Sequence, residues 1–151
     1  MKPIPRLETR PPSRGNRLLG SCNQSGYPVH IVLGTYKSRP LFREPALAAP
    51  LFAIVADHSQ TRACCLMPDH LHWLIADAAR MQQLAESFKS YSTYVARTLG
   101  HGPELWQRSY RDHLLRDEED VRRVAEYIIQ NPVRGGLVDE AHEYPYQRVC
   151  L

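Results

Sequence analysis

The chain lacks the sequence features of cysteine-based zinc proteins, of secreted proteins and of membrane proteins. Its four cysteines are Cys22, Cys64, Cys65 and Cys150, and no C-x-x-C pair occurs among them. Adjacent thiols do not have the usual spacing of zinc ligands, which argues against a cysteine-based zinc site. No secretory leader opens the chain, and no apolar run approaches membrane-spanning length. We therefore expect a cytoplasmic protein with free thiols and no membrane contact.

Net charge is also low, at +3 over 151 residues, and by itself it says little about binding partners. The charge is unevenly distributed, because residues 1–20 hold five basic residues and one acid, and the remaining chain is close to −1. The same stretch is rich in proline. We predict a flexible basic arm over residues 1–24, which either lies along a phosphate backbone or has no role. Residues 25–151 are predicted to form one domain.

The alternation of apolar patterns predicts an α+β fold. One helix, residues 80–99, has an apolar stripe that includes Phe88 and Tyr91, and another should end at Asn131 because Pro132 follows. The tail around Tyr144 is expected to pack back on the body. The order of elements is typical of a ferredoxin-like antiparallel sheet with helices packed on one side. The predicted strands are 27–36, 62–67, 70–76 and 110–115, and the predicted helices are 44–58, 80–99 and 117–131.

The most informative stretch is MPDHLHWLI, residues 67–75, in which a Pro-Asp turn leads into a strand with two histidines. Side chains alternate along a strand, so His70 and His72 should stand side by side on one face. Two neutral imidazoles in this arrangement are well suited to a divalent metal ion. The alternative is that both are hydrogen-bonded core residues.

A second histidine motif is absent. The other histidines are isolated in the sequence, and none forms an H-x-H or H-x-T pair; they are His30, His58, His101, His113 and His142. Most metal-dependent phosphodiesterases that use water as the nucleophile carry such a second motif. Its absence argues against that class.

The last predicted helix presents a second set of polar groups. Tyr127 and Asn131 are four residues apart and share a helical face, and Arg123 lies one turn before Tyr127. If this face meets the histidine strand, His70, His72 and the Asn131 oxygen form a three-ligand site beside a phenol. Gln130 is a rival for the third ligand, but it points about 100° away from Tyr127 around the helix axis. Tyr127 could also be a rim aromatic, and Asn131 a helix cap.

These residues resemble those of the single-tyrosine HUH transposases, in particular the branch of REP-associated tyrosine transposases with an IS200-like domain. The resemblance covers nearly all of residues 27–146. It rests on three stretches: MPDHLHWLI (67–75), LWQRSYRDHLLRDEEDV (105–121) and YIIQNPVRGGLV (127–138). It implies that His70 and His72 bind the metal, that Asn131 is the third ligand and that Tyr127 is the nucleophile.

The resemblance also implies an activity. Members cleave and rejoin single-stranded DNA beside hairpins or repeats, with Mg²⁺ or Mn²⁺, through a 5′-phosphotyrosine intermediate. One nucleophile holds one strand, so exchange of two strands requires either a homodimer or sequential rounds. Two other functions remain open: a domesticated hairpin-DNA-binding regulator without turnover, and a phosphodiesterase that uses water.

Basic and aromatic residues elsewhere are candidates for contacts with DNA. Trp106 could stack on a base or fill the core, and packing is slightly preferred. Tyr91, by contrast, is expected in the core. The predicted DNA-binding set is Lys89, Tyr94, Arg97, Trp106, Arg108 and Arg123.

Overall fold

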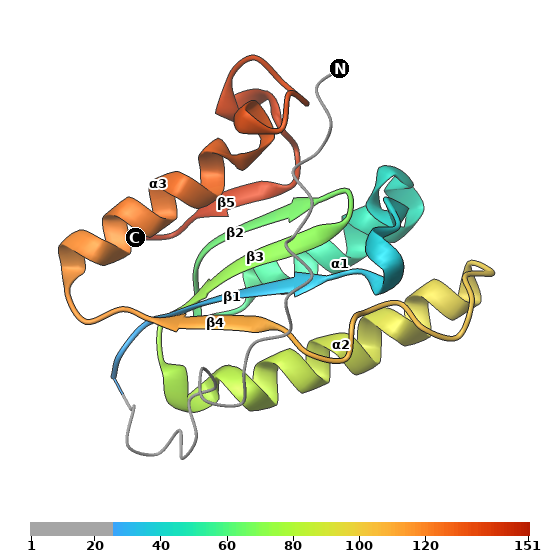
Figure 1. The fold of residues 1–151 in the computed structure, drawn as a ribbon, viewed down its shortest axis with the longest axis horizontal. Coiled ribbons are helices and arrows are strands. Elements are labelled where there is room, and N and C mark those ends of the chain that lie inside the picture. Colours follow the sequence, from blue (N-terminus) through green and yellow to red (C-terminus); the bar gives the residue numbers. More distant parts are fainter. Residues whose placement is uncertain (1–25) are drawn as a thin grey trace.

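A computed structural model describes residues 26–151, so the predicted arm over residues 1–24 lies outside the described residues. Five strands form one antiparallel sheet in the order β4-β1-β3-β2-β5 (Figure 1). The first four have the order of a ferredoxin-like sheet, which confirms the predicted fold class. The strands are β1 (Val29–Gly34), β2 (Thr61–Met67), β3 (His70–Ile75), β4 (Arg111–Leu114) and β5 (Gln147–Val149).

The two faces of the sheet bury different sets of side chains. Along β3, Leu71, Trp73 and Ile75 belong to one apolar cluster, whereas Leu74 belongs to a second cluster on the opposite face. This is the alternation that a strand imposes on successive residues. The whole of β3 is buried, because it lies between β1 and β2 and is covered on both sides. His70 and His72 share the face of Leu74.

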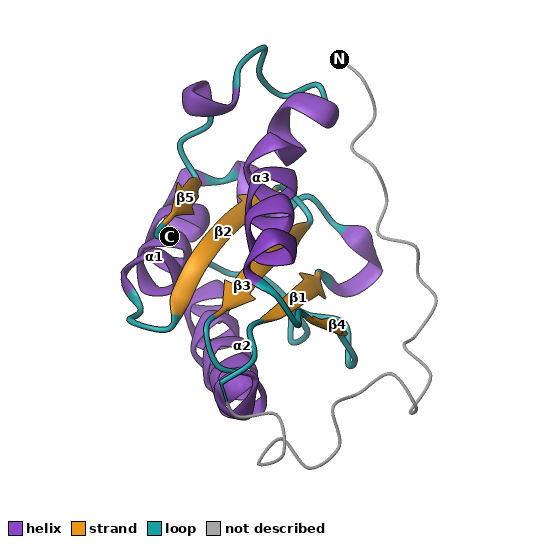
Figure 2. Cartoon of the chain, turned by 90° about the vertical axis from the view of Figure 1, so that its left-hand side faces the viewer, coloured by secondary structure: helices purple, strands orange, loops and turns teal. Residues whose placement is uncertain are grey.

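Helices α1 (Pro45–Asp57) and α2 (Met81–Thr98) pack together on one face, as predicted for these two helices. Helix α3 (Glu118–Arg134) lies across the other face, where Val121, Ala125 and Ile128 contact the second cluster (Figure 2). The face that carries the two histidines is therefore the one that α3 partly covers. This placement brings the residues of the last helix to the histidine strand.

The expected apolar stripe of α2 needs one correction. Phe88 is buried, but Tyr91 is 49% exposed, and the buried position at that level of the helix is Ser92. The hydroxyl of Ser92 donates to the Phe88 carbonyl at 2.6 Å and accepts from the Trp106 indole at 2.7 Å, so its polar group is satisfied in the core. Tyr91 therefore lies at the surface, and the neighbouring Ser92 faces the core.

Helix α3 begins where its sequence predicts but does not end there. The Asp117 side chain accepts a hydrogen bond from the Asp120 amide at 2.8 Å and caps the helix, whose first turn is acidic. The prediction that Pro132 ends the helix at Asn131 is wrong, because the helix continues to Arg134. Proline removes one backbone hydrogen bond, but the helix continues through Pro132, which is buried.

The tail packs back on the body, as expected. The Tyr144 hydroxyl donates to the Leu66 carbonyl at 2.5 Å, and the Leu66 amide donates to the Tyr146 carbonyl at 2.8 Å. The chain then adds β5 to the edge of β2, a strand that the sequence analysis did not predict. Within residues 26–151, no helix has the length and apolar character needed to cross a membrane.

Candidate metal and nucleophile site

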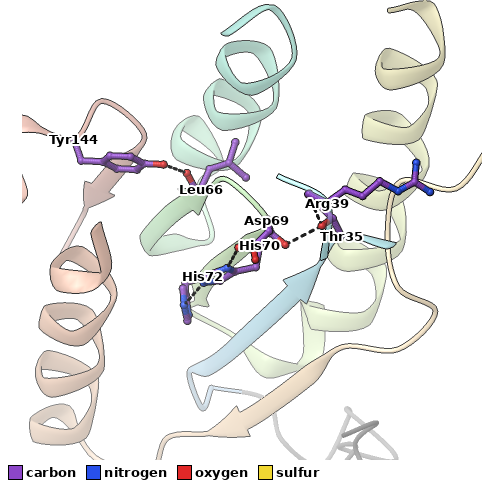
Figure 3. Close-up of polar contacts among 7 residues, drawn as sticks. All are labelled: Thr35, Arg39, Leu66, Asp69, His70, His72 and Tyr144. Carbon is purple, nitrogen blue, oxygen red and sulfur yellow. Dashed lines mark hydrogen bonds and ion pairs between the residues drawn. The ribbon is translucent and has the colours of Figure 1, made fainter. Parts of the chain in front are cut away.

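The turn that precedes the histidines is fixed from outside the hairpin. The Thr35 amide donates to the Asp69 carbonyl at 2.9 Å, and the Thr35 hydroxyl lies between the carbonyls of Arg39 and Asp69, at 2.8 and 3.1 Å. The Phe42 amide donates to the Pro68 carbonyl at 3.0 Å. These bonds hold the Pro68-Asp69 turn against the end of β1 and thereby set the position at which β3 begins (Figure 3).

His70 and His72 lie side by side, as their spacing predicts. Their Nε2 atoms are 3.1 Å apart, and both side chains are buried. Nδ1 of His70 is 2.6 Å from Oδ1 of Asp69, so the carboxylate fixes the orientation of that ring (Figure 3). The carboxylate also determines that Nδ1 of His70 carries a proton, which leaves Nε2 available as an acceptor or a ligand.

His30 joins this pair from the neighbouring strand. Its Nε2 atom is 3.0 Å from Nδ1 of His72, and the two rings stack with centroids 5.2 Å apart. His30 is isolated in the sequence, but in the structure it contacts His72. The available signal was its place as a polar residue between Val29 and Ile31 on a strand, but only the pairing of β1 with β3 shows which side chain it meets.

Burial favours the neutral form of the His30 and His72 imidazoles. Burial, with a smaller contribution from His113, lowers the pKa of His30 to about 4. Burial also holds the pKa of His72 well below its usual value, helped by the neighbouring rings of His70 and His30 and by the Arg134 guanidinium. Neutral imidazoles have a nitrogen lone pair to offer, and this is the form that binds metal ions.

Tyr127 faces this cluster from α3. Its ring is 5.9 Å from the His72 ring and 6.5 Å from the His30 ring, centroid to centroid, and both contacts are edge-on. Tyr127 is 48% exposed. A phenol that touches the buried histidines on one side and reaches solvent on the other is accessible to a macromolecular substrate.

The cation beside Tyr127 is not the residue expected from helical spacing. Arg123 points away and forms ion pairs with Glu119 and Asp120, each with an N···O distance of 3.7 Å. Arg134 instead places its guanidinium carbon 4.0 Å from the centre of the Tyr127 ring and donates to the Tyr127 carbonyl. Arg134 was missed because it follows Pro132, beyond the predicted end of the helix.

Asn131 has the properties of an unused ligand. It is 5% exposed, it lies one turn after Tyr127, and its Nδ2 atom has no hydrogen-bond partner among the described residues. A buried amide without a partner is costly, and the two ends of an amide can exchange by a flip. The helix-cap alternative fails, because the cap is Gly135. Gln130, the rival, is only partly buried.

The donor set fits a hard divalent ion. The Nε2 atoms of His70 and His72 are 3.1 Å apart, so both rings could bind one divalent ion. No group of three or more His, Cys, Asp or Glu side chains within residues 26–151 is placed to hold a metal. A third protein ligand would therefore be of another type, and the buried Asn131 amide is the candidate.

Most of the predicted DNA-binding residues lie away from this site. Lys89, Tyr94 and Arg97 are on α2, which covers the opposite face of the sheet. The Lys89 ammonium contacts the carbonyls of Gln107 and Arg108, and Arg97 donates to the Pro103 carbonyl at 3.1 Å. Tyr94 is 66% exposed. Their role in DNA binding stays a prediction, as does that of the exposed Arg108 and Arg123.

Trp106 is a core residue. It is 6% exposed, and its ring packs against Phe42 and Phe88 with centroids 5.4 and 5.6 Å away. Its indole nitrogen donates to Ser92. The structure supports the packing alternative, and the predicted stacking of this ring on DNA is wrong because the ring has no free face.

Fold and site together define a class: a ferredoxin-like sheet with a histidine pair on a central strand and a tyrosine on a helix that crosses that face. Residues 23–131 match the family described as Transposase IS200 like, and the chain belongs to this family. This result confirms the resemblance found in the sequence.

Two curated relatives extend the comparison. A protein of Haemophilus influenzae, provisionally named a REP-associated tyrosine transposase, is 30% identical over 100 residues, which cover 58% of this chain and 57% of that protein. The REP-associated tyrosine transposase of Escherichia coli K12 is 24% identical over 92 residues, 58% of this chain and 52% of the relative. The chain thus spans about half the length of the curated relatives it matches.

A solved structure shares the fold. It is that of a REP-associated tyrosine transposase bound to a REP hairpin, with a TM-score of 0.57 and 19% sequence identity. The match covers 82% of this chain and 76% of the other. At this level of identity the likeness concerns the fold alone.

Proposed function

We propose that this protein is a metal-dependent single-stranded DNA endonuclease and strand transferase that forms a 5′-phosphotyrosine with hairpin-flanked or repetitive DNA. The observation that carries the proposal is the contact between the half-exposed Tyr127 and the buried His72, whose rings are 5.9 Å apart. Family membership supports a transposase. The relative bound to a REP hairpin supports hairpin DNA as the substrate.

In this proposal the Nε2 atoms of His70 and His72 and the side-chain oxygen of Asn131 hold one Mg²⁺ or Mn²⁺ ion. When bound, such an ion supplies Lewis-acid stabilisation of the charge that develops on the scissile phosphate. Asp69 keeps the His70 ring in its orientation, with Nε2 unprotonated. Both rings are buried.

Tyr127 carries out the covalent step. Its oxygen attacks the phosphorus atom in line with the bond to the 3′ oxygen, and the phenol proton passes to water. The phosphorus–oxygen bond on the 3′ side breaks, and the departing 3′ oxygen takes up a proton. The products are a 3′-hydroxyl and a 5′-phosphate joined to Tyr127. Attack of a 3′-hydroxyl on this phosphotyrosine reverses the step and joins strands without an external energy source.

Arg134 acts beside the nucleophile. Its guanidinium lies over the Tyr127 ring and is bonded to the backbone of the same residue. This contact limits the motion of a tyrosine that is otherwise half-exposed. The positive charge also lies where the phosphate must approach the phenol, and guanidinium groups bind phosphate oxygens well.

The test is incubation of the protein with a labelled hairpin oligonucleotide in Mn²⁺, followed by a denaturing gel. The wild type should give a cleaved strand and a labelled species of protein mass, and Tyr127→Phe should give neither. Hairpin binding without cleavage over several metals and substrates would favour a regulator without turnover. Cleavage that survives in Tyr127→Phe would favour a phosphodiesterase that uses water.

A further inference from the structure

His30 is the part of the cluster to which neither the sequence nor the proposed chemistry gives a role. It lies on β1, and its contact with the site is the bond between its Nε2 atom and Nδ1 of His72. Its partner nitrogen is the one turned away from His70, because the opposite nitrogen of His72 faces Nε2 of His70. His30 therefore contacts the rear of a proposed ligand.

The protons in the row of hydrogen bonds from Asp69 through His70 and His72 to His30 can be assigned by counting donors. The Asp69 carboxylate accepts from Nδ1 of His70, so in a neutral ring Nε2 of His70 is an acceptor. Nε2 of His72 must then donate to it, which leaves Nδ1 of His72 as an acceptor. His30 completes the chain by donating from its own Nε2 atom. In the metal-free protein the bond thus runs from His30 to His72.

Metal binding requires the opposite arrangement. A ligand nitrogen cannot keep its proton, so Nε2 of His72 must lose it and the proton of the neutral ring must reside on Nδ1. Nδ1 then donates, and Nε2 of His30 must accept. No proton is gained or lost by the pair; each ring moves its proton to its other nitrogen. Only a partner that can both donate and accept satisfies both states.

We propose that His30 is a positioning residue of the metal site, whose bond to His72 reverses direction when the metal binds. The inference deepens the proposed function and rests on its metal site. An imidazole meets the requirement because it has one donor and one acceptor that can exchange. A glutamine meets it too, since its amide is about as long and can present either oxygen or NH₂. A methionine of similar length meets neither requirement.

The test compares Mn²⁺ affinity, by titration calorimetry, in the full-length wild type, His30→Gln and His30→Met. Removal of a partner behind a metal ligand typically weakens binding about 10- to 100-fold. We expect a loss of this size in His30→Met and an affinity within about threefold of the wild type in His30→Gln. His58→Met is the matched control, because His58 is partly buried and contacts Trp73 on the opposite face.

Ring-nitrogen chemical shifts supply a second readout. In ¹⁵N-labelled protein at pH 8, the protonated nitrogen of His72 should be Nε2 without metal and Nδ1 with Zn²⁺. The protonated nitrogen of His30 should likewise change from Nε2 to Nδ1.

Unfolding curves of each variant show whether it folds. The inference is overturned if His30→Met binds Mn²⁺ like the wild type, if His30→Gln is as weak as His30→Met, or if the shifts do not exchange. A wild type that binds no divalent ion would instead remove the metal from the proposed function.

Discussion

The ring of Tyr127 meets the ring of His72 edge-on, at 5.9 Å between centroids and an interplanar angle of 82°. The two residues come from α3 and β3, and the contact exists because α3 crosses the histidine face of the sheet. The proposed nucleophile and a proposed metal ligand are thus neighbours in one chain. Tyr127 therefore meets the histidine cluster within one copy of the chain.

Asp69 should control metal affinity through His70. Replacing Asp69 with alanine removes the carboxylate that accepts from Nδ1 of His70 at 2.6 Å, and we expect Mn²⁺ binding to weaken about 10- to 100-fold. Asp139→Ala, at an exposed position, is the control and should bind normally. Unchanged affinity in a folded Asp69→Ala protein would show that the ring needs no such support. Calorimetry measures the difference.

Arg134 should contribute more to the rate of adduct formation than the other arginines of α3. Arg134→Met removes the guanidinium that lies 4.0 Å from the Tyr127 ring centre, and we expect adduct formation to slow at least about tenfold. Arg122→Met, an exposed change on the same helix, should leave the rate within about twofold. Single-turnover gels give both rates. Equal rates in the two variants would refute a role for Arg134.

Trp106 should affect stability and not DNA contact. Trp106→Ala should lower the free energy of unfolding by about 3–5 kcal/mol, since it removes a large buried ring, whereas Tyr94→Ala, at a 66% exposed position, should change it by less than about 0.5 kcal/mol. Urea denaturation measures both. Trp106→Phe should keep hairpin affinity per folded molecule. A stable Trp106→Phe protein with weakened DNA binding would restore the stacking role.

The metal-free protein should lose stability in acid. Unfolded histidines take up protons as the pH falls through about 6.5, whereas burial lowers the pKa of folded His30 to about 4. The contribution of His30 to the free energy of unfolding is therefore fully present above pH 6.5, and it declines as the pH falls toward 4. At pH 5 the loss from His30 alone is about 2 kcal/mol. Urea denaturation in EDTA should show this slope, and His30→Gln should reduce it; a flat profile in the wild type would contradict it.

Local patterns predicted what depends on local geometry. The i, i+2 spacing of His70 and His72 puts them on one face of any strand, and the Pro-Asp turn before them marks where the strand begins. Likewise, the i, i+4 spacing of Tyr127 and Asn131 survives because both lie within one helix. The fold class followed from the order of such elements.

The features that the sequence did not predict depend on contacts between segments that are distant in the chain. His30 meets His72 only through the register of β1 against β3, which no local pattern encodes. Arg134 reaches Tyr127 because the helix continues through Pro132, against the local preference of proline. The core position on α2 is Ser92 and not Tyr91, because the packing partners Phe88 and Trp106 are satisfied by a small hydroxyl there. Each error arose where tertiary packing overrode a local rule.

The most direct measurement is the site of covalent attachment to DNA. After incubation with a hairpin-flanked oligonucleotide and Mn²⁺, nuclease digestion and mass spectrometry should find a 5′-phosphorylated nucleotide on Tyr127, and no adduct in Tyr127→Phe. Attachment to another tyrosine, or an adduct that persists in Tyr127→Phe, would contradict the account.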